Sequence, residues 1–274
     1  MLNNLEFDHA DIFADLDAIK LQFHHLLRTV PRSGAVIWNQ DEPALREVLA
    51  RGCWSQQLGF GAKAGDWLLQ QTATGFAVSS PTGGPYPLNS SLAGRHNAMN
   101  AVAALAAVAA AGIDPTKALA ALPGFRGVKR RLEHLGTIAG VSVFDDFAHH
   151  PTAIAATVEA LAERAPGARR IGVLEMRSNS MRAGAHRAGL AAALHALDGC
   201  YVLAPNSLSW DIHETLAPLG KRCQIFTDTR ALLSGLIRDS VAGDQVLIMS
   251  NGGFDGLHQR LLEALTRSGA GDSE

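Results

Sequence analysis

Apolar residues in the first part of the chain are spaced in two different ways. Apolar side chains at helical spacing predict helices, and these cover residues 14–28, 43–50, 98–111 and 115–122. Short apolar runs broken by glycines predict strands, and these cover residues 35–39, 54–60, 66–72 and 75–79. This part of the chain is therefore predicted to be a mixed α/β unit.

Strands and helices alternate regularly after residue 126. A hairpin comes first, with strands predicted over 133–138 and 141–144, and four short apolar strands follow at 170–174, 200–203, 224–226 and 245–249. Helices are predicted between and after them, at 151–163, 185–197, 212–219, 229–240 and 257–266. This alternation predicts a mainly parallel sheet covered on both faces, with ligand-binding loops at the carboxyl ends of its strands.

The best boundary between the two patterns is the Gly/Pro-rich segment 123–127. A chain of 274 residues is long enough for two domains of ordinary size. We therefore expect one domain at residues 1–125 and a second at residues 126–274.

Composition excludes several classes of protein. Apolar residues make up 47% of the chain and the net charge is −2 with both signs mixed, so neither disorder nor a nucleic-acid or anionic-membrane partner is expected. No apolar run reaches the roughly 18 residues needed to span a bilayer, and acidic residues near the start argue against a secretory signal. Cys53, Cys200 and Cys223 form no CxxC pair, so we expect buried, reduced thiols in a cytoplasmic protein.

Two polar clusters lie in the first predicted domain. His9 stands among the carboxylates of segment 6–11, which suits Mg²⁺ or Mn²⁺, although a helix-capping loop would look similar. In segment 91–100, Gly94 lets a ligand approach the backbone where a helix begins, and the free amides there could bind a nucleotide. The alternative is that Asn97 simply caps this helix.

Two more clusters lie in the second predicted domain. Segment 129–133 is basic, and segment 145–151 carries two acids and two histidines; arginine can clamp phosphate, and histidine can transfer a proton near neutral pH. Exposed surface charge explains Lys129 and Arg130, but it explains segment 145–150 poorly, which favours a function. Segments 175–182 and 250–254 follow predicted strands, where a carboxylate ligand could meet arginine and backbone amides, or the chain could simply turn.

Together and in this order, the clusters resemble the Mur ligase family of ATP-dependent amide ligases. Segment 6–11 resembles its metal-binding histidine loop, and segment 94–100 its nucleotide motif Gly-x-His-Asn-x-x-Asn. Segments 131–133 and 145–151 resemble the start of its C-terminal domain. The resemblance covers nearly the whole chain.

Three strings narrow the resemblance within the family. They are found at residues 4–11, 176–181 and 249–254, and they are similar to the branch that joins L-alanyl-γ-D-glutamyl-meso-diaminopimelate to UDP-N-acetylmuramate in peptidoglycan recycling. Segment 145–151 argues against the folylpolyglutamate synthetases, which share the architecture. The resemblance implies a partial central ATPase domain followed by a Rossmann-like C-terminal domain, with ATP and Mg²⁺ as cofactors and an acyl-phosphate intermediate.

The resemblance also implies roles for individual residues. His9 would be a magnesium ligand. His96 and Asn97 would contact the nucleotide, and either Asp145 or Asp146 would contact its ribose. Arg131 would contact the phosphates, and Arg131 and His149 would act in catalysis. Position alone assigns the murein tripeptide to Arg177, Ser178, Asn179 and Asn251.

The chain departs from the family in one large respect. It has neither the UDP-sugar domain nor a Gly-x-x-x-x-Gly-Lys-[Ser/Thr] phosphate loop, and segment 59–63 does not fit that pattern. Phosphoryl transfer depends on that loop, so we expect the chain alone to be inactive, as a truncated part of a ligase. The alternative is a non-catalytic module that binds a nucleotide or a murein peptide.

Overall fold

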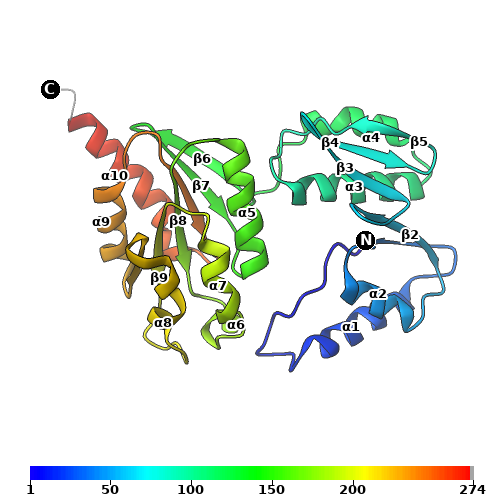
Figure 1. The fold of residues 1–274 in the computed structure, drawn as a ribbon, viewed down its shortest axis with the longest axis horizontal. Helices are drawn as coiled ribbons and strands as arrows, with labels where there is room; N and C mark the ends of the chain where they lie inside the picture. Colours follow the sequence, from blue (N-terminus) through cyan, green and yellow to red (C-terminus); the bar gives the residue numbers. More distant parts are fainter. Residues whose placement is uncertain (272–274) are drawn as a thin grey trace. The chain divides into compact units, whose positions relative to one another are not determined.

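The structure is a computed structural model that describes residues 1–271, with side chains up to residue 267. The chain forms two units, Met1–Arg126 and Gly127–Glu274, and Figure 1 shows the elements of each. The last three residues of the expected second domain, 272–274, lie outside the described residues.

The first unit contains a five-stranded sheet in the order β1-β2-β3-β4-β5. Its strands are β1 (Ala35–Asn39), β2 (Gln56–Gly61), β3 (Trp67–Thr72), β4 (Gly75–Ser80) and β5 (Gly83–Pro87). The first three run parallel, whereas β3, β4 and β5 form an antiparallel meander. The sequence pattern did not predict β5, because its two glycines and two prolines carry no strand signal; prolines are tolerated here because β5 is an edge strand.

Helices cover both faces of this sheet. They are α1 (Leu16–Thr29), α2 (Pro43–Ala50), α3 (Arg95–Ala110) and α4 (Pro115–Ala121). Alternate residues of β1 point to opposite faces, so Ile37 packs in a cluster with Val102 of α3, while Trp38 packs in another with Val48 of α2. The sequence placed the start of α3 three residues too late, since Arg95, His96 and Asn97 already belong to the helix.

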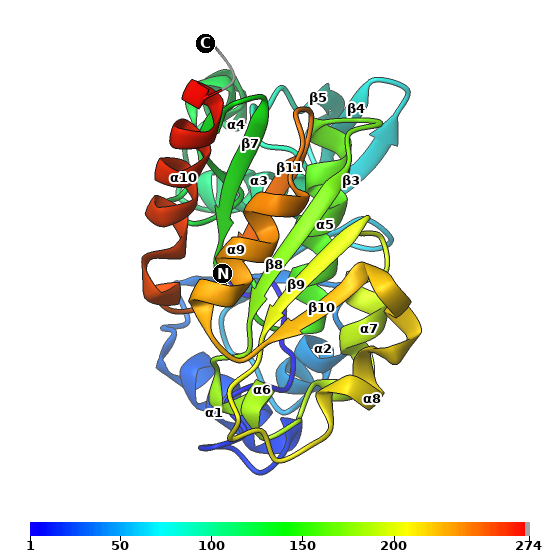
Figure 2. The ribbon, with the colours of Figure 1, turned by 90° about the vertical axis from the view of Figure 1, so that its left-hand side faces the viewer.

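The second unit contains a six-stranded sheet in the order β10-β9-β8-β11-β7-β6, seen face-on in Figure 2. Its strands are β6 (Glu133–Ile138), β7 (Val141–Asp146), β8 (Arg170–Glu175), β9 (Gly199–Leu203), β10 (Cys223–Phe226) and β11 (Gln245–Met249). All pairs are parallel except β6 with β7. The predicted α/β fold with a mainly parallel second sheet is thus confirmed.

Helices cover both faces of the second sheet as well. They are α5 (Pro151–Arg164), α6 (Asn179–Arg182), α7 (Arg187–Leu194), α8 (Ile212–Leu216), α9 (Thr229–Asp239) and α10 (Leu257–Gly271). In Figure 2, α9 and α10 lie on the near face, where Leu236 and Leu261 pack with Val143 and Val246 of the strands. None of the helices within residues 1–271 has both the length and the apolar character that a bilayer crossing requires.

We predict that residues 127–274 fold without the first unit. Their core of strand and helix side chains is complete within the unit, and the segment leading into it is rich in glycine and proline. Expressed alone, this unit should give one cooperative thermal transition by circular dichroism. A broad, non-cooperative transition, or an aggregated product, would contradict the prediction.

Candidate functional site

The N-terminal loop lies beside the start of α3. Leu2 pairs with β1 through hydrogen bonds to Ile37 and Asn39, and the side-chain amide of Asn3 donates to Asn100 Oδ1 at 2.8 Å. His9 stands exposed at the tip of the following turn, with φ 54°, and its carbonyl accepts hydrogen bonds from the amides of Ile12 and Phe13. Asn3, which precedes the predicted histidine loop, is therefore bonded to the last residue of the predicted nucleotide motif.

Within the described part of the chain, His9 does not belong to a cluster of three or more metal-ligand side chains. Among the described residues, no group of three or more His, Cys, Asp or Glu side chains could hold a metal. Lys20 contributes a buried ammonium that bonds to Glu47 at 2.6 Å and Asp17 at 3.2 Å, and the hydrogen bond to Glu47 is the main reason that its pKa is raised. The role of His9 as a magnesium ligand therefore stays a prediction.

The start of α3 is held by its own loop. Gly94 is the residue before the helix and has φ 95°, a conformation that favours glycine. The Asn97 side chain donates to Ala93 O at 2.7 Å, so it fixes the turn from inside the helix. The alternative that Asn97 caps the helix is therefore wrong.

Arg131 and His149 contact the same aromatic ring in the second unit. The exposed Arg131 guanidinium lies 5.5 Å from the centre of the Phe147 ring, and the His149 ring meets that ring edge-on at 5.4 Å. His149 Nδ1 is 2.9 Å from Phe147 O, which orients the imidazole. Within the described residues, the Arg131 guanidinium makes no hydrogen bond or ion pair, so its donors face solvent.

Both acids of the pair 145–146 belong to the end of β7, and not to a loop as the sequence suggested. Asp146 is 4% exposed and accepts hydrogen bonds from the amides of Leu132 and Ala148; burial outweighs these bonds and raises its pKa. Asp145 is also buried, which by itself raises its pKa, but His258 and Arg130 outweigh burial and lower it. A ribose would have to share oxygens that already accept hydrogen bonds.

Arg130 is not the exposed surface charge that the sequence suggested. Its Nε lies 3.2 Å from Asp145 Oδ2, and its Nη2 donates to the carbonyls of Ser250 at 2.6 Å and Gly252 at 2.8 Å. The predicted hairpin gave one indication of the contact with Asp145, since Arg130 precedes the first strand of the hairpin and Asp145 lies at the end of the second.

A cavity of about 230 Å³ opens where β8, β9 and β10 end. It is lined by Glu175, Met176, Arg177, Arg182, Leu203, Pro205 and Thr227. Arg177 was predicted as a substrate residue, whereas Arg182 was not. The Arg182 guanidinium donates to Ser207 Oγ at 2.8 Å, which holds it at the cavity. Two guanidinium groups beside an apolar wall suit a ligand that carries carboxylates.

The other predicted substrate residues do not line this cavity, but each lies on a segment next to a lining residue. Ser178 caps α6, since its Oγ accepts a hydrogen bond from Met181 N at 3.2 Å, and Asn179 is the exposed first residue of that helix. A side chain at Gly252 would collide with Arg177, so Arg177 lies against the 250–252 loop. On that loop, Asn251 Oδ1 is buried and has no hydrogen-bond partner among the described residues.

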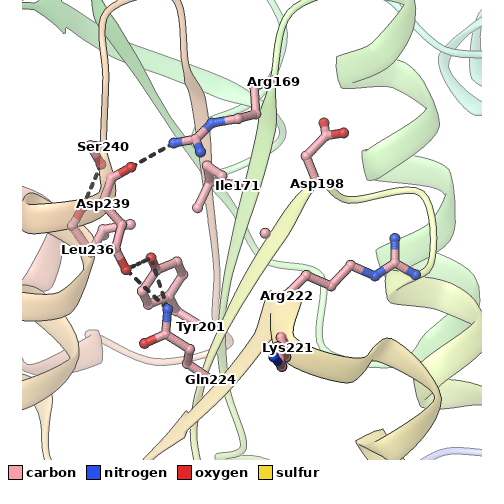
Figure 3. Close-up of a pocket in the computed structure, with 11 residues that line it drawn as sticks. Arg169, Ile171, Asp198, Tyr201, Lys221, Arg222, Gln224, Leu236, Asp239 and Ser240 are labelled. Atoms are coloured by element: carbon pink, nitrogen blue, oxygen red, sulfur yellow. Dashed lines mark hydrogen bonds between the residues drawn. The ribbon is translucent and has the colours of Figure 1, made fainter.

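A second cavity, of about 220 Å³, lies at the opposite, amino-terminal edge of the same strands (Figure 3). It contains none of the predicted site residues. Several of its polar groups have partners within the fold: Arg169 bonds to Asp244 at 2.7 Å, and the Tyr201 hydroxyl donates to Asp239 at 2.6 Å. These bonds stabilise the fold at this edge.

The three thiols are free, but only Cys200 is buried; Cys53 and Cys223 are half-buried. Cys200 and Cys223 are register partners on the adjacent strands β9 and β10. The expectation of three buried thiols is therefore wrong for Cys53 and Cys223.

Two family models match the chain. Residues 1–108 match the Mur ligase middle domain, and residues 130–252 match the Mur ligase glutamate ligase domain. The solved structures agree. A murein peptide ligase from Psychrobacter arcticus matches with a TM-score of 0.69 and 35% identity over 93% of this chain and 56% of that one. An alanine ligase from Thermotoga maritima, 22% identical with a TM-score of 0.73 over 95% of this chain and 58% of that one, supports the fold alone.

The sequence relatives carry related names. UDP-N-acetylmuramate–L-alanyl-γ-D-glutamyl-meso-2,6-diaminoheptandioate ligases from Escherichia coli and Haemophilus influenzae are 42% and 40% identical to this chain over 97% of it. The chain spans 59% of the length of each. With two family models along its length and these relatives, the chain belongs to the Mur ligase family.

Proposed function

We propose that this chain supplies the peptide-binding domain and part of the ATP-binding domain of a ligase that joins a murein tripeptide to UDP-N-acetylmuramate. The cavity beside Arg177 and Arg182 is the single observation that carries the proposal. In this scheme the bond-forming step occurs only when the chain is joined to the remaining part of such a ligase, and the chain alone is inactive.

The tripeptide chemistry supports the use of this cavity. A peptide ending in diaminopimelate carries several carboxylates, and Arg177 and Arg182 can each bind one with two parallel hydrogen bonds. Asn251 would contact the peptide from the loop that lies against Arg177. Ser178 and Asn179 would contact the peptide from the start of α6.

Both units would supply nucleotide contacts in this proposal. In the first unit these would be His96 and Asn97, and in the second unit Arg131 would contact the phosphates. Asp145 or Asp146 would accept a hydrogen bond from the ribose, and His149 would act beside Arg131. A magnesium ion would take His9 as one of its ligands.

A chimera tests the proposal directly. The chain would be fused to the part of the Escherichia coli relative that it does not match, and ATP-dependent joining of the tripeptide to UDP-N-acetylmuramate would be measured. We expect ligation by the chimera and none by the chain alone, because the chain lacks a phosphate loop.

The same assay separates the alternatives. A chimera that folds and binds both substrates, yet forms no product, would contradict the proposal and favour a non-catalytic binding module. Product formation by the chain alone would contradict the proposal that ligation requires the remaining part of the ligase. Titration of the 274-residue chain with the tripeptide in a calorimeter then tests the peptide site without any turnover.

A further inference from the structure

Arg130 and Arg131 are consecutive, and both guanidinium groups stack on the Phe147 ring, but their other contacts differ. The Arg131 guanidinium is exposed, whereas Arg130 is half-buried. The backbone of Arg130 has φ 59°, and it is fixed by two bonds: Arg130 N donates to Glu133 Oε2 at 2.7 Å, and Phe147 N donates to Arg130 O at 3.0 Å. These contacts aim the two side chains differently.

The Arg130 guanidinium joins the end of β7 to the loop after β11. One nitrogen pairs with Asp145, and another donates to the carbonyls of Ser250 and Gly252. Asp145 is held from its other side by His258 of α10, whose Nε2 lies 3.0 Å from Oδ1. A carboxylate fixed at both oxygens gives Arg130 a rigid anchor from which it holds the loop.

The 250–252 loop is also tied to the peptide cavity. Ser250 Oγ bonds to the carboxylate of Glu175, which lines the cavity, and accepts a hydrogen bond from Gly252 N at 2.8 Å. Gly252 lies against the Arg177 side chain, which also lines the cavity. The position of this loop therefore determines where Arg177 and Asn251 meet a ligand.

We propose that Arg130 is a positioning residue for the peptide site: it holds the 250–252 loop so that Arg177 and Asn251 can bind the tripeptide. This inference rests on the proposed function. Its neighbour Arg131 serves the nucleotide, so two adjacent arginines serve two different substrates. Arg130 itself touches neither substrate in this scheme.

The substitutions Arg130→Ala and Arg130→Lys remove different parts of the contact. Alanine leaves the Asp145 carboxylate and two loop carbonyls without their donor. Lysine keeps the charge beside Asp145, but its single ammonium cannot donate to all three oxygens that the planar Arg130 guanidinium contacts. Arg131→Ala is the matched control, since it removes the adjacent guanidinium and leaves these bonds intact.

Calorimetric titration of the 274-residue chain with the tripeptide provides the first measurement. We expect Arg130→Ala to weaken binding by about tenfold or more and Arg130→Lys to weaken it by about threefold to tenfold, as the loss of charge-assisted hydrogen bonds predicts. Arg131→Ala should leave the affinity within about twofold. Thermal melts check that each variant is folded, and if Arg130→Ala is not, Arg130→Lys decides.

Kinetics of the chimera then separate positioning from general damage. Arg130→Lys should raise the KM for the tripeptide while the KM for ATP stays within about twofold. Arg131→Ala should raise the KM for ATP while the KM for the tripeptide stays within about twofold. General damage to the fold would change both KM values in each variant. The inference would be overturned if folded Arg130→Lys bound the tripeptide within twofold of the parent, or if both KM values changed equally. The proposed function would stand in either case. No tripeptide binding by the parent chain would overturn the proposed function and this inference with it.

Discussion

Replacing Arg131 by alanine should lower the turnover of the chimera by about two to three powers of ten, the loss found when one charge-stabilising donor is removed. The reason is its exposure: the guanidinium lies against Phe147 and makes no hydrogen bond or ion pair within residues 1–271, so its donors are available to phosphate. Since nothing in the fold depends on those donors, the free energy of unfolding should change by less than about 0.5 kcal/mol.

The matched control for Arg131→Ala is Lys129→Ala, because Lys129 is an exposed cation of the same basic segment. Its removal should leave turnover within about twofold, which is the weak effect expected of a solvated surface charge. His149→Ala should also lower turnover more than stability, as the half-buried imidazole only meets the Phe147 ring edge-on. Equal losses for Lys129→Ala and Arg131→Ala would indicate a general field of positive charge in place of a specific phosphate contact.

The fold was predictable from the sequence because burial leaves a pattern in it. The second sheet is mostly parallel and buried on both faces, so its strands, such as β8 and β11, read as short apolar runs between helical segments. The same reasoning missed β5, whose glycines and prolines suggest a turn and whose edge position tolerates them. It also predicted a ligand-binding loop at residues 175–180 without the short helix α6, which a Ser178 cap starts there.

The sequence indicated candidate site residues by two routes. The resemblance to the Mur ligases gave roles to Arg131 and His149, and position after a predicted strand gave one to Arg177; these roles stay predictions. Arg130 was interpreted as surface charge because its partners, the carbonyls of Ser250 and Gly252, lie 120 and 122 residues away in the sequence. Contacts to distant backbone atoms leave no trace in residue type or periodicity, so only the folded structure reveals them.

The carboxylates at the end of β7 show the same limit. Two consecutive acids indicated a ligand contact, but folding uses both of them: Asp146 fixes the backbone at Leu132 and Ala148, and Asp145 joins Arg130 to His258. A pair of acids that suggests a ligand contact in the sequence can thus also serve the fold, and the ribose contact stays a prediction.

Replacing Phe254 by alanine should destabilise the second unit by about 3–5 kcal/mol, the usual cost of emptying a fully buried aromatic position. Phe254 is 0% exposed and packs with Leu257 of α10 and Val246 of β11, where the chain leaves the 250–252 loop. Because exchange of strand amides reports unfolding of the second unit, protection in β8 and β11 should fall by about two to four powers of ten. Val241→Ala, at a position 56% exposed, is the control and should change stability by less than about 0.5 kcal/mol. A loss below about 1 kcal/mol for Phe254→Ala would mean that this side chain does not anchor the loop.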